Sequence, residues 1–272
     1  MYVYLPFFLN RLELIRLSLS WFDLTHNIRF FRELSENNSR SLFMHPYLKM
    51  LKEFNEQYGV KIQLNLFYQD TAFNLSSFSE QYRKEWKDNA DWLKMSFHSK
   101  LENPYPYESA TYEQVYNECN AVQSEILRFA GSESLAATTT IHCTKITAEG
   151  LNALKNLGVK GLLGLYGNSA MPKKSYLTSE ADSERIRAGE IVSVDKIAYA
   201  GIDVILNCFS CAGNLRQLQN LQDRDVVKIM IHEQYFYEDY AQYQADFRKK
   251  LEQAFEFLIE KGFVSCFFEE LL

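Results

Sequence analysis

Three short apolar segments of this chain each end in a histidine, and a fourth is followed by an aspartate. The four polar residues at these ends are His98, His142, His232 and Asp23. In parallel α/β folds, the carboxyl ends of the strands meet at one edge, and the catalytic residues are found there. We therefore expect these four side chains to surround one cleft. Three imidazoles and a carboxylate in one place are typical of a metal site or an acid–base site.

Segments typical of strands alternate with segments typical of helices along the chain. Pro46 and Thr111, the latter with Gln114 three residues later, are typical first residues or caps of helices. About eight strands with helices between them favour a parallel sheet that closes, or nearly closes, into a barrel. No shift in composition divides the chain, so we predict a single domain over residues 1–272. The predicted strands are 14–22, 60–68, 93–98, 135–142, 159–166, 191–194, 203–209, 226–232 and 263–268.

Composition and charge exclude several classes of function. The chain has 272 residues, a net charge of −6 and no basic stretch, which argues against binding to nucleic acid or an anionic membrane surface. Residues 1–9 are apolar but lack a basic region, so we expect a strand or a packed arm, not a signal peptide. No segment is long enough to span a membrane. Five scattered cysteines favour reduced thiols and a cytoplasmic location. No feature defines an oligomeric state.

In their order and spacing, the residues at the strand ends resemble the polysaccharide deacetylase superfamily, in particular the nodulation-type chitooligosaccharide deacetylases. The resemblance extends from about residue 14 to residue 272. It implies a distorted (β/α) barrel that removes N- or O-acetyl groups from sugars with one divalent metal, often zinc. The residues that carry it are Asp23, His98-Ser99, His142 and Ile229-Met230-Ile231-His232.

The resemblance also implies a set of metal ligands. In the family, a Thr-Phe-Asp-Asp motif supplies a catalytic base and then a ligand, and residues 20–23 align with it. Asp23 then takes the ligand position and Phe22 replaces the base. A register shifted by one residue makes Asp23 the base and puts Leu24 in the ligand position, so one carboxylate is missing either way. His98 is the second expected ligand, and Glu102 stands four residues later, where the family has a further histidine.

Three residues are expected to carry the proton transfers. His232 matches the family's general acid, which protonates the leaving amine or alkoxide. His142 stands where the family has an arginine that steadies the base. With that base replaced, His142 or Glu233 is expected to take the proton from water. The expected substrate is an acetylated sugar or polysaccharide, and the expected cofactor is a divalent metal, zinc in the first instance.

Two other functions remain open from the sequence. The missing carboxylate and the missing arginine also fit an inactive deacetylase-like barrel that binds a glycan or a protein partner. A different metal-dependent sugar enzyme on the same barrel is the other alternative. Residues that could border the site, although no pattern selects them, are His26, Asn27 and Asp70.

Three further features have less specific explanations. Cys208 and Cys211 have the spacing of a zinc or redox pair, but no further ligands with matching spacing stand nearby, so neither use is favoured. His45, before Pro46, is expected to pack at a helix entry or lie on the surface. Aromatic residues near predicted strand ends fit a sugar-stacking wall or core packing equally well. They are Trp21, Phe22, Phe67, Tyr68, Phe97, Tyr166 and Tyr235.

Overall fold

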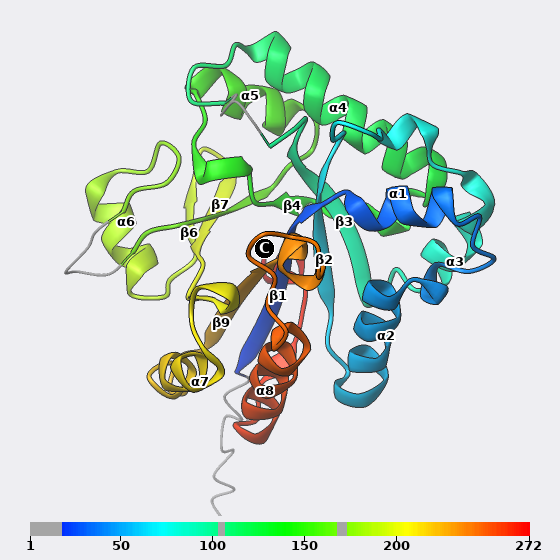
Figure 1. Ribbon diagram of the computed structural model, residues 1–272. Coiled ribbons are helices and arrows are strands. Elements are labelled where there is room, and N and C mark those ends of the chain that lie inside the picture. Colours follow the sequence, from blue (N-terminus) through cyan, green and yellow to red (C-terminus); the bar gives the residue numbers. More distant parts are fainter. Residues whose placement is uncertain (1–17, 103–106, 168–172) are drawn as a thin grey trace, which may run out of the picture.

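The computed structural model describes residues 18–102, 107–167 and 173–272 (Figure 1). The N-terminal segment expected to form a strand or packed arm therefore lies outside the described residues. The described chain is an α/β fold with two sheets whose strands are almost all parallel. None of its described helices has both the length and the apolar character that a membrane crossing requires.

The first sheet has the strand order β3-β2-β1-β9-β8, and β10 pairs with the first residues of β1. All neighbours in it are parallel. The second sheet has the order β4-β5-β7-β6, with only β6 antiparallel to its neighbour. The strands are β1 (Leu19–Asn27), β2 (Ile62–Phe67), β3 (Leu93–Ser99), β4 (Thr138–Thr139), β5 (Gly161–Gly164), β6 (Val192–Val194), β7 (Ile197–Gly201), β8 (Val204–Ile205), β9 (Val226–His232) and β10 (Val264–Ser265).

The two sheets adjoin at two places. The edge strand β3 forms an isolated parallel bridge between Met95 and Leu135, just before β4. At the other side, β7 leads directly into β8, and the amide of Asp203 between them donates to the carbonyl of Lys228 in β9 at 2.9 Å. The strands therefore follow one another around a common interior, as expected for a distorted (β/α) barrel, although the described ladders make two sheets and not one continuous ring.

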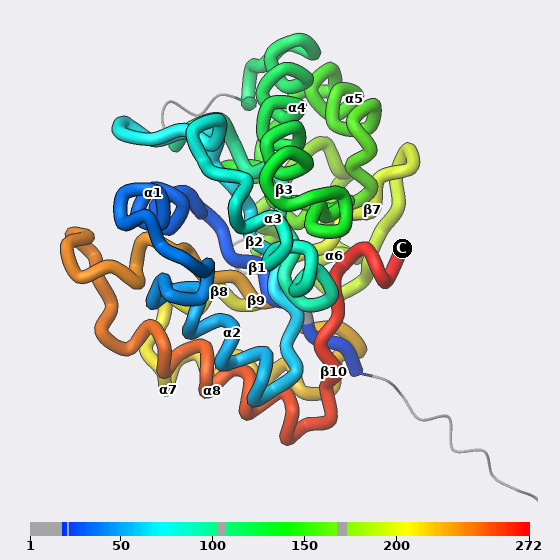
Figure 2. The backbone as a smooth tube through the Cα atoms, turned by 90° about the vertical axis from the view of Figure 1, so that its right-hand side faces the viewer, coloured from blue at the N-terminus to red at the C-terminus, as the bar shows by residue number. Residues whose placement is uncertain are grey.

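Two groups of helices cover the outside of the strands (Figures 1 and 2). The helices α4 and α5 lie side by side on one side, and α2, α7 and α8 lie on another. The helices are α1 (Arg29–Glu36), α2 (Pro46–Tyr58), α3 (Arg83–Asp88), α4 (Tyr112–Phe129), α5 (Ala148–Asn156), α6 (Glu180–Arg187), α7 (Cys211–Gln219) and α8 (Phe247–Glu260).

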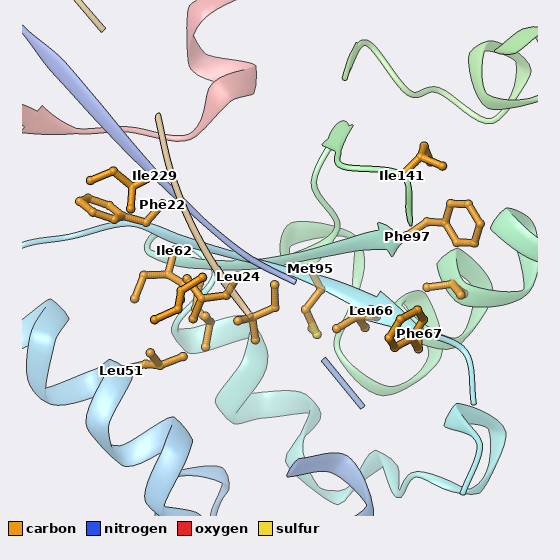
Figure 3. Packing of buried hydrophobic residues seen from close by; sticks show 14 of the residues in the cluster. Phe22, Leu24, Leu51, Ile62, Leu66, Phe67, Met95, Phe97, Ile141 and Ile229 are labelled. Carbon is orange, nitrogen blue, oxygen red and sulfur yellow. The ribbon is translucent and has the colours of Figure 1, made fainter. Parts of the chain in front are cut away.

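The strands of the first sheet have one apolar and one polar face. Phe22 and Leu24 of β1 belong to the apolar core, and Phe22 contacts Phe255 of α8 with ring centroids 4.5 Å apart. Figure 3 shows part of this core, including Leu24 and Ile62 and, from α2, Leu51. Side chains alternate along a strand, so the residues between them face the interior. These interior residues are polar and buried, and they form hydrogen bonds with each other and with Thr138 of β4 in the second sheet: Asp23, Gln63, Asn65 and Ser96.

Several predicted elements are confirmed and others are corrected. The helix start at Pro46 and the helix cap at Thr111 are confirmed, as are the strands around residues 62–67, 93–99 and 226–232. The predicted strand 135–142 contains only β4, because the chain turns after it with φ of 58° at Cys143 and 55° at Thr144. The strand predicted at 203–209 is similarly reduced to β8.

Several elements, among them β7, α6 and α7, are absent from the sequence-based prediction. The strand β7 consists largely of small residues, which give little strand signal. The polar composition of residues 167–190 predicts a loop, but this stretch contains α6, which begins after the cap Ser179. The side chain of Ser179 accepts a hydrogen bond from the amide of Asp182 at 3.1 Å. Polar composition concealed this helix because a surface helix needs only a narrow apolar face.

Candidate metal centre

Three imidazoles converge at the carboxyl edge of the strands. His26 is near the end of β1, His98 is near the end of β3, and His142 follows β4. One ring nitrogen from each lies within 4.8 Å of the other two, and no other such group of donor atoms is found among the described residues. The ring centroids are 5.1 to 5.2 Å apart. The structure therefore brings His98 and His142 together, as expected, and it adds His26 to this group of imidazoles.

Hydrogen bonds define which nitrogens of His98 and His142 face each other. Nδ1 of His98 lies 2.5 Å from the carbonyl oxygen of Thr140. A carbonyl only accepts, so Nδ1 carries the hydrogen and Nε2 carries the lone pair. That Nε2 lies 3.2 Å from Nδ1 of His142. Nitrogen ligands about 2.0–2.1 Å from a tetrahedral zinc lie about 3.3 Å from each other, so this spacing fits two ligands of one ion.

The protonation states of the three histidines also fit a metal. Burial lowers the pKa of His98 well below its usual value, with a further contribution from His142. Burial likewise lowers the pKa of His26, and the neighbouring imidazoles add to this effect. The pKa of His142 is lowered by burial, although a hydrogen bond to the backbone of Glu102 acts in the other direction. Neutral imidazoles bind metals, so the donor set fits a divalent ion such as zinc.

A local irregularity in β1 directs His26 to this place. The pairing of β1 with β2 shifts by one residue between Leu24 and Asn27, and His26 has a φ of 64°. A histidine in this region of φ is uncommon and strained, and such strain is frequent at functional sites. The Asn27 side chain holds the irregularity, because its amide donates to the carbonyls of Leu24 at 2.6 Å and Asn65 at 3.2 Å.

Sequence reasoning placed His26 only at the border of the site. The available signal was its position three residues after Asp23, but the predicted strand 14–22 ends before it, whereas β1 continues to Asn27. A regular strand would have turned residues 23 and 26 to opposite faces, because side chains alternate with a period of two. The extra residue in β1 reverses this relationship. A bulge of this kind leaves no clear trace in the sequence.

The loop that carries His142 is held from the side of β5. The hydroxyl of Tyr176 accepts from the amide of Ile141 at 3.3 Å and donates to the carbonyl of Leu163. The amide of Tyr176 donates in turn to the carbonyl of Thr144 at 2.9 Å. These bonds hold the left-handed backbone of residues 143–144 in place, and with it the ring of His142.

His232 lies beside the cluster. Its ring centroid is 4.7 Å from that of His26. Its Nδ1 lies 2.9 Å from Oδ1 of Asn207, an oxygen that also accepts from the His232 amide at 3.3 Å. Nδ1 therefore carries the hydrogen and Nε2 the lone pair. Burial, followed by the nearby His142, lowers the pKa of His232 to about 4, so the ring is neutral at pH 7.

Asp23 is connected to His98 through Thr140, and both of its carboxylate oxygens accept hydrogen bonds. It is 1% exposed, and its Oδ2 accepts from Oγ1 of Thr140 at 2.5 Å. Its Oδ1 accepts from the Asn65 amide. Burial raises the pKa of Asp23 to about 7, although both hydrogen bonds lower it. Asp23 does not belong to the group of converging donor atoms, so its role as a metal ligand stays a prediction.

The two glutamates selected from the sequence have different positions. Glu102 is exposed at the rim, and its Oε1 is 3.9 Å from Nδ1 of His26. Glu233 is fully buried, and its carboxylate accepts from the amides of Ile28 at 2.9 Å and Phe30 at 3.0 Å, and from the Tyr237 hydroxyl. Glu233 therefore holds the beginning of α1. Burial raises its pKa to about 7, against the effect of these hydrogen bonds.

A cavity of about 330 Å³ opens over the cluster. These four histidines and Glu102 line it, together with threonines such as Thr25 and apolar side chains such as Leu165. An adjoining cavity of about 560 Å³ shares His26 and Glu102 with it and contains Phe67, Tyr237 and Tyr240. Of the aromatic residues expected at strand ends, Phe22, Phe67 and Phe97 belong to the core, and Phe67 also contacts the imidazoles.

Comparisons with known proteins give the class of fold. No protein-family model and no curated protein sequence matches the chain. Solved structures do match, and they show the α/β fold of the polysaccharide deacetylases. The expected resemblance to that superfamily is confirmed at the level of the fold. Membership of the nodulation-type group stays a prediction.

The individual neighbours are distant in sequence. The Bc1960 peptidoglycan N-acetylglucosamine deacetylase superposes with a TM-score of 0.52 at 12% identity, over 94% of this chain and 88% of that one. A Mycobacterium smegmatis protein assigned as a polysaccharide deacetylase gives 0.51 at 9% identity, over 93% and 89%. The 4-alpha-glucanotransferase from Thermococcus litoralis gives 0.59 at 13% identity over 93% of this chain. The present chain spans only 40% of the length of that enzyme.

Proposed function

We propose that this protein is a metal-dependent hydrolase that removes acetyl groups from a carbohydrate. The observation that carries the proposal is the convergence of three neutral imidazoles in a cavity at the carboxyl edge of a deacetylase fold. The Bc1960 neighbour, which is a peptidoglycan N-acetylglucosamine deacetylase, supports an acetylated sugar as the substrate class. We propose zinc as the ion because imidazole nitrogens are preferred zinc ligands.

The proposed ligands are His26, His98 and His142, with Glu102 as a further oxygen donor from the rim. His26 replaces Asp23 in the set expected from the sequence, because His26 belongs to the group of converging donor atoms and Asp23 does not. Glu102 remains in the set because its carboxylate lies 3.9 Å from His26 and is not buried. A bound divalent ion would polarise the acetyl carbonyl and make a water molecule more acidic.

We propose that His232 handles the proton in both halves of the reaction. Its neutral ring has a lone pair on Nε2, because Nδ1–H is directed to Asn207. Nε2 accepts a proton from the attacking water while the water oxygen bonds to the acetyl carbon. The same nitrogen then gives that proton to the leaving amine or alkoxide as its bond to the carbon breaks. This assignment replaces His142, a proposed ligand, and Glu233, whose oxygens hold α1, as the proton acceptor.

Glycosyl transfer is less compatible with this cavity than deacetylation. The glucanotransferase neighbour raises that chemistry, and enzymes that cleave glycosidic bonds usually place two carboxyl groups on either side of the bond. Among the described residues, Glu102 is the only carboxylate that lines the histidine cavity. A single carboxylate together with four imidazoles favours hydrolysis assisted by a metal.

Metal analysis and one assay test the proposal together. Protein purified without chelator should contain close to one equivalent of zinc or a similar ion. It should release acetate from an acetylated chitooligosaccharide or an O-acetylated polysaccharide. His98→Ala should lose both properties, whereas the matched control His45→Ala, outside the cluster, should keep them. A full metal content with no acetate release from either substrate would contradict deacetylation while leaving the metal centre intact.

A second candidate function is binding without catalysis. The observation that favours it is that the two buried carboxylates nearest the cluster, Asp23 and Glu233, both accept hydrogen bonds from the protein through both oxygens. A barrel that only binds a glycan would need no free base. Metal-free wild-type protein that binds acetylated oligosaccharides in calorimetry, but releases no acetate with added zinc or cobalt, would support this function over hydrolysis.

A further inference from the structure

A buried carboxylate connects to the metal centre through a single residue, Thr140. We infer that Asp23 is a positioning residue, which fixes the carbonyl of Thr140 and through it the ring of His98, and that it does not bind the metal itself. The inference rests on the proposed function for the identity of the ion. It assigns to Asp23 a role that differs from the one expected from its place in the sequence.

Thr140 donates one hydrogen bond and accepts another. Its hydroxyl donates to Oδ2 of Asp23 at 2.5 Å, and its carbonyl accepts from Nδ1 of His98 at 2.5 Å. All three residues are at most 3% exposed. Water therefore cannot easily replace either bond. The direction of the Thr140 carbonyl, and hence the direction of the lone pair on Nε2 of His98, depends on the bond to Asp23.

The other oxygen of Asp23 is engaged on the side of β2 and β3. It accepts from the amide of Asn65, and the side-chain oxygen of Asn65 accepts from the hydroxyl of Ser96 and from Gln63 at 2.9 Å. Ser96 lies two residues before His98 on β3. Asp23 thus connects two segments: one oxygen is linked through Asn65 to Ser96 on β3, and the other is bonded to Thr140 after β4. The relative position of His98 and the Thr140 carbonyl follows from this connection.

Ligand chemistry explains why such a connection matters. A histidine that binds a metal usually donates its other N–H to a carbonyl or carboxylate, which fixes the tautomer and the orientation of the ring. Changes to such supporting residues typically reduce metal affinity about 10–100-fold. Here the support has two parts, the Thr140 carbonyl and the Asp23 carboxylate. Both oxygens of that carboxylate accept hydrogen bonds from the protein, and Asp23 does not belong to the group of converging donor atoms.

Variants at Thr140 separate positioning from direct ligation. Thr140→Val keeps the shape and the carbonyl but loses the hydroxyl that reaches Asp23. Thr140→Ser keeps the hydroxyl and is the matched control. Cobalt(II) titrations of the metal-free proteins, followed by absorption, should give an affinity about 10–100-fold weaker for Thr140→Val. The affinity of Thr140→Ser should remain close to that of wild type, and the stoichiometry should stay at one ion.

The role of Asp23 itself is tested by exchanging its carboxylate with the amide of Asn65. Asp23→Asn places an amide donor opposite one of the two present donors, the Asn65 amide or the Thr140 hydroxyl, and should weaken cobalt binding about as much as Thr140→Val does. The double variant Asp23→Asn with Asn65→Asp restores a donor facing an acceptor and should recover most of the affinity. If the single Asp23 variant is poorly folded, the double variant and the Thr140 pair still give the comparison.

A readout without metal keeps the inference separate from the proposed function. Nitrogen-15 spectra of the metal-free protein should show His98 as the Nδ1–H tautomer in wild type and Thr140→Ser, and a mixture of tautomers in Thr140→Val. Unchanged tautomer and unchanged cobalt affinity in Thr140→Val would overturn the inference. Loss of cobalt binding in Asp23→Asn, with normal binding in Thr140→Val, would also overturn it and make Asp23 a ligand. If wild type binds no cobalt, the proposed function fails, and the tautomers alone decide the role of Asp23.

Discussion

The ring of His232 lies 4.7 Å from the ring of His26, centroid to centroid, on the neighbouring strand β9. His26 belongs to the group of converging donor atoms and His232 does not. In the proposed mechanism, His232 can therefore exchange a proton with a substrate beside His26 without being a metal ligand itself. The hydrogen bond from Nδ1 of His232 to Asn207 keeps the ring in place.

His232→Ala should therefore separate catalysis from metal binding. A positioned general acid or base typically contributes about 10²–10⁴-fold in rate, and turnover of an acetylated sugar should fall by about that factor. The metal content should stay at the wild-type value. Asn207→Ala, which removes only the acceptor for Nδ1–H, should give a smaller loss of the same kind. A His232→Ala protein with full turnover and only a lower thermal midpoint would show that His232 has a structural role.

Substitutions at His26 should affect metal binding and stability differently. Both His26→Ala and His26→Gly remove a proposed ligand and should lose the ion. The φ of 64° strains every residue with a Cβ, so the glycine variant should be more stable than the alanine variant by about 1 kcal/mol. Urea unfolding of both proteins in the presence of chelator measures the difference. Equal stabilities would mean that the bulge relaxes when the imidazole is removed.

The sequence predicted which strand ends form this site better than it predicted which side chains converge there and how they are hydrogen-bonded. Strand-ending His98, His142 and His232 come together because parallel strands share a carboxyl edge, and that rule needs only the order of the segments. His26 was not selected, because its orientation depends on an extra residue in β1. The engagement of both Asp23 oxygens depends on Asn65 and Thr140, which are distant in sequence and have no motif.

The same difference applies to the fold. Helices with caps and regular apolar spacing, such as α2 and α4, could be predicted because their signals are local. The short strands β4 and β8 could not, since the point at which they end is decided by contacts with distant segments. The left-handed turn at residues 143–144 is one example, because Tyr176, more than thirty positions later in the chain, holds it in place.

Glu233 should prove structural and not catalytic. Its carboxylate accepts hydrogen bonds from two amides at the start of α1 and from Tyr237, and all three donors are already in place. Glu233→Gln would set an amide donor against one of these donors, which should cost about 1–3 kcal/mol of unfolding free energy. Turnover per folded molecule at a temperature well below the midpoint should remain within a few-fold of wild type. A loss of about 10²-fold or more with the fold intact would return Glu233 to the role of proton acceptor.

His45 should contribute to the sensitivity of the fold to acid. It is buried before α2, where its Nδ1 accepts from the amide of Tyr47 at 3.3 Å and its Nε2 lies 2.9 Å from Glu33. Burial lowers the pKa of His45, and Arg29 adds to this effect, although Glu33 raises it. The folded state therefore binds a proton less readily than the unfolded chain. The stability that depends on neutral His45 is present above about pH 6.5 and is lost as the pH falls below it.

The variant His45→Asn tests this pH dependence. Asparagine can still accept from the Tyr47 amide, but it does not titrate. Between pH 6.5 and 5, the unfolding free energy of wild type should fall more steeply than that of the variant, by at most about 1.4 kcal/mol per pH unit. Both proteins must be free of metal, because bound metal competes with protons at the other histidines. Those histidines, Asp23 and Glu233 titrate alike in the two proteins and cancel in the difference. Parallel pH profiles in urea unfolding would show that His45 takes up its proton equally well in the folded state.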